Sequence, residues 1–195
     1  MRYEEFKELT TKARTYRRFK EGSPIAIETL TDIVDTARVV PSAGNGQPLR
    51  YAVSVNRDMN ARIFANLKWA AALKEWPGPL EGERPAGYIV MGSNTAPKLH
   101  QIDLGIAAQT IQLGLAAQGI TCCMLASINA KAIHQLVGFP EDIPVLLVLA
   151  LGYPGEKVVL EPLPADGGTT YWRDEKDNHH VPKRALQDIL LKTFA

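Results

Sequence analysis

Hydrophobic and polar residues follow two different periods along this chain. Between Pro24 and Pro41, the residues Leu30, Ile33 and Val34 recur at helical spacing, which predicts a helix that ends at the second proline. Short apolar runs bounded by turn residues predict strands. The expected helices cover the first residues up to about 13, then 25–40, 58–67, 103–118 and 130–137, and the expected strands cover 51–55, 87–91, 120–125 and 143–151.

Two of these segments are apolar on more than one face. The helix over 103–118 is apolar almost all round, so we expect it in a large core or a subunit interface. The run IPVLLVLAL from Ile143 is apolar on both faces of a strand, which places it inside a sheet. Together the elements predict an α+β protein with a small mixed central sheet flanked by helices, rather than a doubly wound nucleotide fold.

Capping residues define one of the shorter helices, and the last forty or so residues differ in composition from the rest of the chain. Asn129 is expected to cap the helix over 130–137 and Gly138 to terminate it. The stretch YWRDEKDNHHVPKR is too polar to build a core, and LQDILLKTF is expected to form an amphipathic helix. His179 and His180 could bind a metal, but as neighbours they do not share a face, and a solvated loop is the favoured interpretation.

Composition limits the classes of protein that fit. The 195 residues suit a single domain over 1–195, and 22 basic against 21 acidic residues give a net charge of +1. No strong field therefore draws the protein to nucleic acid or to an anionic membrane. The first residues lack a signal-peptide core and no run approaches the roughly 20 apolar residues of a membrane span, so we expect a cytoplasmic protein. Cys122 and Cys123 lie in an apolar run, and packing is favoured over redox chemistry.

Several catalytic and nucleotide-binding signatures are missing. The only GxG spacing, Gly44 and Gly46, leads into Gln47 and Pro48 and does not form the GxGxxG of a Rossmann unit. The sequence also lacks GxxxxGK[ST], HExxH, paired CxxC and GxSxG. No metal is therefore expected.

Three separated segments remain as candidates for ligand binding. In residues 14–19, Arg14 and Arg17 are close enough in sequence to converge on one phosphate, although a solvated basic face anchored by Phe19 is the alternative. Residues 41–48, PSAGNGQP, combine glycines that admit a close ligand with amide side chains, and an ordinary turn explains them equally well. Lys183 and Arg184 either complete a phosphate site or solubilise the tail.

In this order the three segments resemble the nitroreductase family of FMN-dependent oxidoreductases, over nearly the whole chain. The family's Arg-Ser-x-Arg-x-Phe stretch is similar to residues 14–19, and its Pro-Ser-x-x-Asn-x-Gln-Pro segment is similar to residues 41–48. Its Gly-Leu-Gly-x-Cys stretch is similar to residues 119–123, and its late basic residues correspond to Lys183 and Arg184. Ala13, Leu49 and Thr121 depart from the family's pattern.

The resemblance implies a fold, a partner and a set of site residues. It implies an intertwined α+β homodimer with FMN between the subunits and a C-terminal arm, over about 155–195, on the partner. The FMN phosphate would be held by Arg14, Thr15, Arg17, Lys183 and Arg184. The partner subunit would supply the segment containing Pro41, Ser42, Ala43, Asn45 and Gln47, and the flavin ring would face the backbone of Leu125, Ala126 and Ser127.

The resemblance also implies a reaction. The flavin performs the redox step, so no catalytic side chain is expected. NADH or NADPH would deliver hydride and leave, and a nitroaromatic, a quinone or a related small-molecule oxidant would follow in the same pocket, giving ping-pong kinetics. The alternatives are a non-catalytic flavin-binding protein, a specialised flavin enzyme such as a reductive dehalogenase, and a purely structural dimer. Residues 69–85 are the candidate pocket wall and lid, with Trp69 and Trp76 as its flat surfaces, unless both tryptophans pack on the core.

Overall fold

A computed structural model describes residues 1–73, 75–94 and 97–195. These residues form two compact units: the first comprises Met1–Trp69 and Gly78–Gly155, and the second comprises Ala70–Pro77 and Glu156–Ala195. The candidate pocket wall over 69–85 includes Lys74, which lies outside the described residues. The described residues of this segment form no helix or strand. That the whole chain acts as one domain stays a prediction.

A four-stranded antiparallel sheet forms the centre of the first unit. Its strands are β1 (Leu49–Ser54), β2 (Gly87–Ser93), β3 (Thr121–Leu125) and β4 (Val145–Gly152), in the order β1-β2-β4-β3. The four strands predicted from the sequence are confirmed, and β4 is internal, as its apolar run indicated. A parallel bridge from Thr15 to Cys122 adds a short parallel contact to β3.

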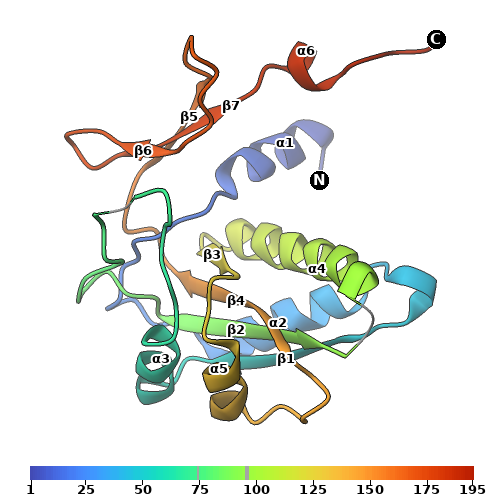
Figure 1. Cartoon of the computed structure of the whole chain (residues 1–195), viewed down its shortest axis with the longest axis vertical. Helices are drawn as coiled ribbons and strands as arrows, with labels where there is room; N and C mark the ends of the chain where they lie inside the picture. The colour runs from blue at the N-terminus through green and yellow to red at the C-terminus, as the bar shows by residue number, and fades with distance from the viewer. Residues whose placement is uncertain (74, 95–96) are drawn as a thin grey trace. The chain divides into compact units, whose positions relative to one another are not determined.

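Helices cover both faces of this sheet (Figure 1). On one face, α2 (Ile27–Arg38) and α4 (Pro97–Ala117) pack against a core that includes Ile89 and Met91 of β2. On the other face, α3 (Arg57–Phe64) and α5 (Ala130–Val137) pack against Tyr88 and Val90. Successive residues of β2 point to opposite faces, and all are buried, so this strand connects two cores. The helix α1 (Tyr3–Lys12) lies against α4.

The end signals of α5 act as the sequence predicted. The Asn129 side chain accepts a hydrogen bond from the backbone N–H of Ala132 at 3.3 Å, and Gly138 ends the helix in the left-handed region at φ 68°. An N-cap of this kind stabilises a helix by about 1 kcal/mol. The helix therefore has the predicted bounds.

The long helix α4 begins at Pro97, six residues before the predicted start, and has one buried and one exposed apolar face. Leu99, Ile102 and Ile106 recur at spacings of three and four and are 47%, 54% and 37% exposed. The opposite face lies in the core and includes Ala107, Ala108, Ile111 and Leu115. We name the first three residues the α4 stripe.

The second unit contains a small sheet that the sequence did not predict. Its strands β5 (Val158–Pro162), β6 (Trp172–Arg173) and β7 (His179–Lys183) pair in the order β5-β7-β6, with β5 parallel and β6 antiparallel to β7. The interpretation of His179 and His180 as a solvated loop is wrong, because both lie on β7 and His179 is 1% exposed. Alternation along the strand puts them on opposite faces, and the described residues contain no cluster that could hold a metal ion.

The end of the chain differs from the predicted amphipathic helix. Only α6 (Leu186–Ile189) is helical, and Leu191 and Phe194 beyond it are 84% and 92% exposed. A short helix without packing on its apolar side is marginal, which explains why the pattern stops after one turn. In the described part of the chain, no helix is both long and apolar enough to cross a membrane.

Candidate functional site

The basic stretch over residues 14–17 lies along the free edge of β3. Thr15 forms the parallel bridge with Cys122, and the backbone N–H of Tyr16 donates to the carbonyl oxygen of Cys122 at 3.1 Å. Arg14 and Arg17 are half-buried beside this pairing. Two of the predicted phosphate-binding arginines therefore lie beside a strand edge.

Phe19 anchors the end of this stretch. Its side chain is 1% exposed in the core that also contains Tyr88 and Val90, and its backbone N–H donates to the carbonyl oxygen of Glu83 at 2.9 Å. The adjacent Arg18 forms an ion pair with Glu83, with 3.3 Å between Nε and Oε2. Phe19 is thus anchored in the core at the end of the basic stretch.

The predicted ring-facing backbone follows β3 directly. Leu125 is buried at the end of the strand, whereas Ala126 and Ser127 are exposed. The carbonyl oxygen of Ser127 accepts a hydrogen bond from the N–H of Lys68 at 2.9 Å, which ties this segment to the end of the α3 region. One strand therefore connects the basic stretch with the exposed backbone at 126–127.

Residues 42–47 form a turn, and we call this segment the 42–47 turn. It is exposed apart from the half-buried Ser42, and three of its residues are left-handed: Gly44 at φ 57°, Asn45 at 55° and Gln47 at 46°. A left-handed residue other than glycine costs on the order of 1 kcal/mol and persists only where its surroundings hold it. Here the Ser42 hydroxyl accepts from the N–H of Gln47 at 3.0 Å, and the Gln47 amide donates to Asn45 Oδ1 at 3.2 Å.

Asp103 holds the same turn from α4. It is 2% exposed, and its Oδ1 accepts a hydrogen bond from the backbone N–H of Ala43 at 3.0 Å. The sequence interpretation did not assign this residue. The available signal was a single carboxylate in a helix that is mostly apolar. Such a helix is expected to be buried, and a buried charge needs hydrogen-bond partners.

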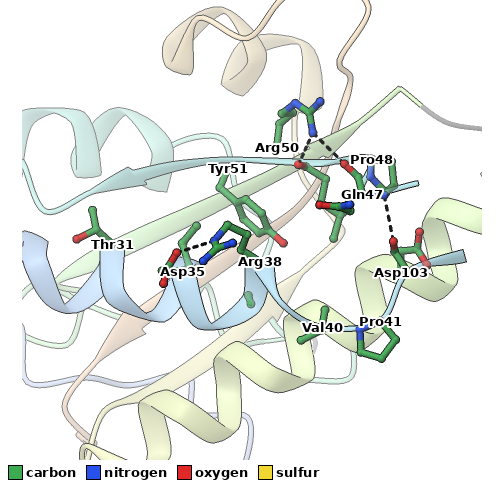
Figure 2. Close-up of a pocket in the computed structure, with 14 residues that line it drawn as sticks. Thr31, Asp35, Arg38, Val40, Pro41, Gln47, Pro48, Arg50, Tyr51 and Asp103 are labelled. Atoms are coloured by element: carbon green, nitrogen blue, oxygen red, sulfur yellow. Dashed lines mark hydrogen bonds and ion pairs between the residues drawn. The ribbon is translucent and has the colours of Figure 1, made fainter. Parts of the chain in front are cut away.

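A cavity of about 390 Å³ lies beside the turn and is lined by residues of the turn, of α2 and of the start of β1 (Figure 2). Pro41, Gln47, Tyr51 and Asp103 form part of its wall. Burial raises the pKa of Tyr51 to about 12. At the rim, Arg38 donates to Asp35 at 2.6 Å, and this hydrogen bond lowers the pKa of the aspartate.

The other predicted site residues are distributed between the two units. Trp69, in the first unit, packs against Phe64 with ring centroids 5.9 Å apart, which agrees with the core-packing alternative for this residue. Trp76, in the second unit, lies under the guanidinium of Arg173 at 5.3 Å. Lys183 ends β7, and both Lys183 and Arg184 are exposed.

Cys122 and His180 have altered titration. Cys122 and Cys123 are both free and buried, as packing predicts, and burial raises the pKa of the Cys122 thiol. His180 lies between two carboxylates, at 2.8 Å from Glu161 and 3.2 Å from Asp174, and its ring stacks on Trp172. The hydrogen bonds to Glu161 and then to Asp174 raise the pKa of His180.

The order of these segments along the chain is that of a known family. The model of the nitroreductase family matches residues 10–153, which include the basic stretch, the 42–47 turn and β3. The chain belongs to the nitroreductase family. Membership confirms the resemblance and the oxidoreductase class predicted from the sequence.

Similar proteins support the same assignment. A protein of Archaeoglobus fulgidus named as an NADH dehydrogenase/NAD(P)H nitroreductase is 28% identical over 144 residues, covering 68% of this chain and 76% of the relative. Iodotyrosine deiodinase 1 of Pongo abelii is 21% identical over 190 residues, and the match covers 83% of this chain but only 65% of that protein.

Solved structures with this fold confirm the α+β architecture of nitroreductases. A nitroreductase family protein from Clostridium novyi NT has a TM-score of 0.64 at 24% identity, covering 76% of this chain and 86% of the other. The FMN-dependent nitroreductase NfnB of Mycobacterium smegmatis, solved in complex with NADPH, has a TM-score of 0.61 at 18% identity, covering 77% and 89%. At these identities the likeness concerns the fold.

Proposed function

We propose that this protein is an FMN-dependent oxidoreductase that uses NAD(P)H to reduce nitroaromatics, quinones or related electrophilic small molecules. The observation that supports it most directly is the pairing of Thr15 with Cys122, which aligns the basic stretch with the strand that leads to the exposed backbone of Ala126 and Ser127. The FMN-dependent nitroreductases of the same fold, one of them in complex with NADPH, agree with this choice of cofactor and donor.

The residues of the first unit fit the chemical groups of FMN. Arg14 and Arg17 suit a phosphate because guanidinium groups form charge-assisted, bidentate hydrogen bonds with it, and the Thr15 hydroxyl adds a further donor. In this proposal Lys183 and Arg184 complete the phosphate site. The backbone of Leu125, Ala126 and Ser127 faces the ring.

The 42–47 turn belongs to the partner's flavin in this proposal. The hydrogen bond to Asp103 puts the turn beside the N-terminal half of α4. Cys122, with which the basic stretch pairs, follows the C-terminal end of that helix in the chain. The helix rises about 20 Å between Asp103 and Ala117 at about 1.5 Å per residue. Two copies of the chain would bring the two segments onto one ligand, with Ser42, Ala43, Asn45 and Gln47 supplied by the partner.

The α4 stripe supplies an apolar surface for such a dimer. Three large side chains in one exposed row are typical of an interface rather than of a solvated helix. The exposed apolar residues at the end of the chain suit the same arrangement, in which an arm over about 155–195 packs on the partner subunit. These residues are Leu186, Ile189, Leu190, Leu191 and Phe194.

In the reaction, bound FMN would supply the redox chemistry between NAD(P)H and the oxidant. The chain's own residues would bind its phosphate, orient its ring and donate hydrogen bonds to the pyrimidine edge of the ring, a role we assign to the Asn45 amide and to backbone N–H groups. Trp76 and the described part of residues 69–85 are proposed to contact the oxidant. The predicted cytoplasmic location is retained as part of this proposal.

The first test is the visible spectrum of the purified protein, recorded before and after anaerobic addition of NADH or NADPH. The proposal expects a yellow protein that releases about one FMN per chain and bleaches with either donor. A yellow protein that does not bleach would favour non-catalytic flavin binding. A colourless protein that FMN cannot reconstitute would refute the proposal.

A paired variant tests the phosphate site. Replacing both Arg14 and Arg17 with alanine should weaken FMN binding by at least about 100-fold, because each hydrogen bond to a charged group contributes about 1.5–3 kcal/mol. The matched control replaces Arg57 and Arg62, two exposed arginines of α3, and should bind FMN as the wild type does. Fluorescence titration of the FMN-free proteins measures both.

A second candidate is reductive removal of halogen from an aromatic ring by the same cofactor. It is favoured by the similarity to iodotyrosine deiodinase 1, which extends over 83% of this chain. Anaerobic single turnovers of the reduced protein with a nitroarene, a quinone and an iodophenol would separate the candidates. Release of iodide without reduction of the nitroarene would favour the second.

A further inference from the structure

Hydrogen bonds hold the 42–47 turn in its conformation. The cavity of about 390 Å³ lies beside it, with Pro41 and Gln47 in the wall (Figure 2). The turn has left-handed φ values at Asn45 and Gln47. Such a conformation persists only where other contacts determine it.

Asp103 links this turn to α4, and Arg50 of β1 donates to the carbonyl oxygen of Gln47 at 3.1 Å. The bonds from Gln47 to Ser42 and Asn45 are internal to the turn, whereas the bond from the Ala43 N–H to Asp103 Oδ1 reaches α4. The Asp103 residue is only 2% exposed, so its carboxylate is largely shielded from bulk water. A buried charge is costly without such a donor, and this favours one position of the turn.

We infer that Asp103 is a positioning residue for the flavin: by accepting the Ala43 N–H, it sets the conformation in which the 42–47 turn meets the cofactor. This inference rests on the proposed function, in which Ser42, Ala43 and Asn45 contact FMN. Asp103 acts through the turn and is not itself required to touch the cofactor. Its loss should therefore weaken FMN binding without removing the phosphate site on the basic stretch.

Two substitutions separate the hydrogen bond from the size of the side chain. Asp103→Leu removes the acceptor, and Asp103→Asn keeps an acceptor oxygen at the same place. We expect Asp103→Leu to weaken FMN binding about 10- to 100-fold, the equivalent of one hydrogen bond to a charged group. Asp103→Asn should stay within about threefold of the wild type, since it can still accept the Ala43 N–H.

The control is a buried polar residue elsewhere in the same unit. Asn60 is 9% exposed on α3, and its side-chain amide donates to the carbonyl oxygen of Ala86 at 3.0 Å. Asn60→Ala should lower the thermal midpoint while leaving the FMN affinity of the folded protein unchanged. A loss of affinity in Asp103→Leu alone then reports the turn rather than general destabilisation.

Ala43→Pro removes the same hydrogen bond from the other side. Ser42 already has the extended backbone, φ −132° and ψ 155°, that proline requires of the preceding residue. In this background Asp103→Leu should change FMN affinity by less than about threefold, because the bond is already absent. If Asp103→Leu does not fold, Ala43→Pro alone carries the test, and wild-type affinity in it would overturn the inference.

Hydrogen exchange of the FMN-free protein gives a readout that is independent of the cofactor. The Ala43 amide should be protected in the wild type and in Asp103→Asn, and should exchange at least about tenfold faster in Asp103→Leu. Equal exchange in all three, or an Asp103→Leu protein that binds FMN as the wild type does, would overturn the inference. A wild type with a protected Ala43 amide that takes up no FMN would instead refute the proposed function.

Discussion

Replacing Gly155 with alanine is predicted to destabilise the fold by displacing the anchor of the basic stretch. A Cβ at position 155 would lie 2.8 Å from the backbone N, C and O atoms of Phe19. These atoms cannot rotate away as a side chain could, because the Phe19 N–H is bonded to Glu83 and the Gly155 N–H donates to Arg18 at 3.0 Å. Overpacking of this kind costs about 1–3 kcal/mol.

This cost translates into a measurable change. For a protein of this size, each kcal/mol lowers the thermal midpoint by about 2–4 °C, so the midpoint should fall by about 2–12 °C. Because residues 14–17 directly precede the displaced anchor, FMN affinity should fall as well. Circular dichroism measures the midpoint, and fluorescence titration of the FMN-free protein measures the affinity.

Gly22→Ala is the matched control for this substitution. No atom lies within 4 Å of a Cβ built at Gly22, and its φ is not in the left-handed region. The control should therefore unfold at the wild-type midpoint, within about 2 °C. If Gly155→Ala behaved like Gly22→Ala in both assays, the close contact with Phe19 and its role as the anchor of the arginines would be refuted.

Three further predictions concern other parts of the molecule. Hydrogen bonds to Glu161 and Asp174 raise the pKa of His180, so its contribution to stability is complete below the unfolded value of about 6.5 and is lost as pH rises through the raised value. The difference in the free energy of unfolding between wild type and His180→Gln, measured in urea, should therefore shrink from pH 6 to pH 9. A difference that stays constant with pH would contradict this role of His180. Ile106→Asp places a charge in the α4 stripe and should produce monomers in sedimentation experiments. A variant that remains dimeric would refute the stripe as the dimer interface. Trp76→Ala should change the relative rates with several oxidants more than the FMN content, and unchanged kinetics would remove Trp76 from the proposed pocket.

Much of the first unit could be predicted because its signals are local or strongly periodic. Asn129 and Gly138 define α5 through contacts with residues a few positions away. The run from Ile143 identified β4 as internal, because only a strand covered on both faces is apolar throughout. The motif segments over 14–19 and 41–48 were also recognisable, and the family match over 10–153 includes both.

The second unit could not be read in this way. The polar residues around His180 form a strand because they find partners on β5 and β6, and Glu161 is 19 positions away in the sequence. A pattern of residues over a few neighbouring positions does not predict the pairing of strands that lie far apart in the sequence. The apolar residues after Leu186 formed only one helical turn, because periodicity alone does not stabilise a short helix.

The sequence by itself determined the family, the order of the strands and main helices of the first unit, and the residues that suit a phosphate or a planar ring. These depend on residue type and on spacing over a few positions. Only the tertiary structure decided that Thr15 pairs with Cys122 and that Asp103 holds the amide of Ala43, 60 positions away. Contacts between residues so far apart in the sequence form only when the helices pack on the sheet, because this packing brings their atoms together.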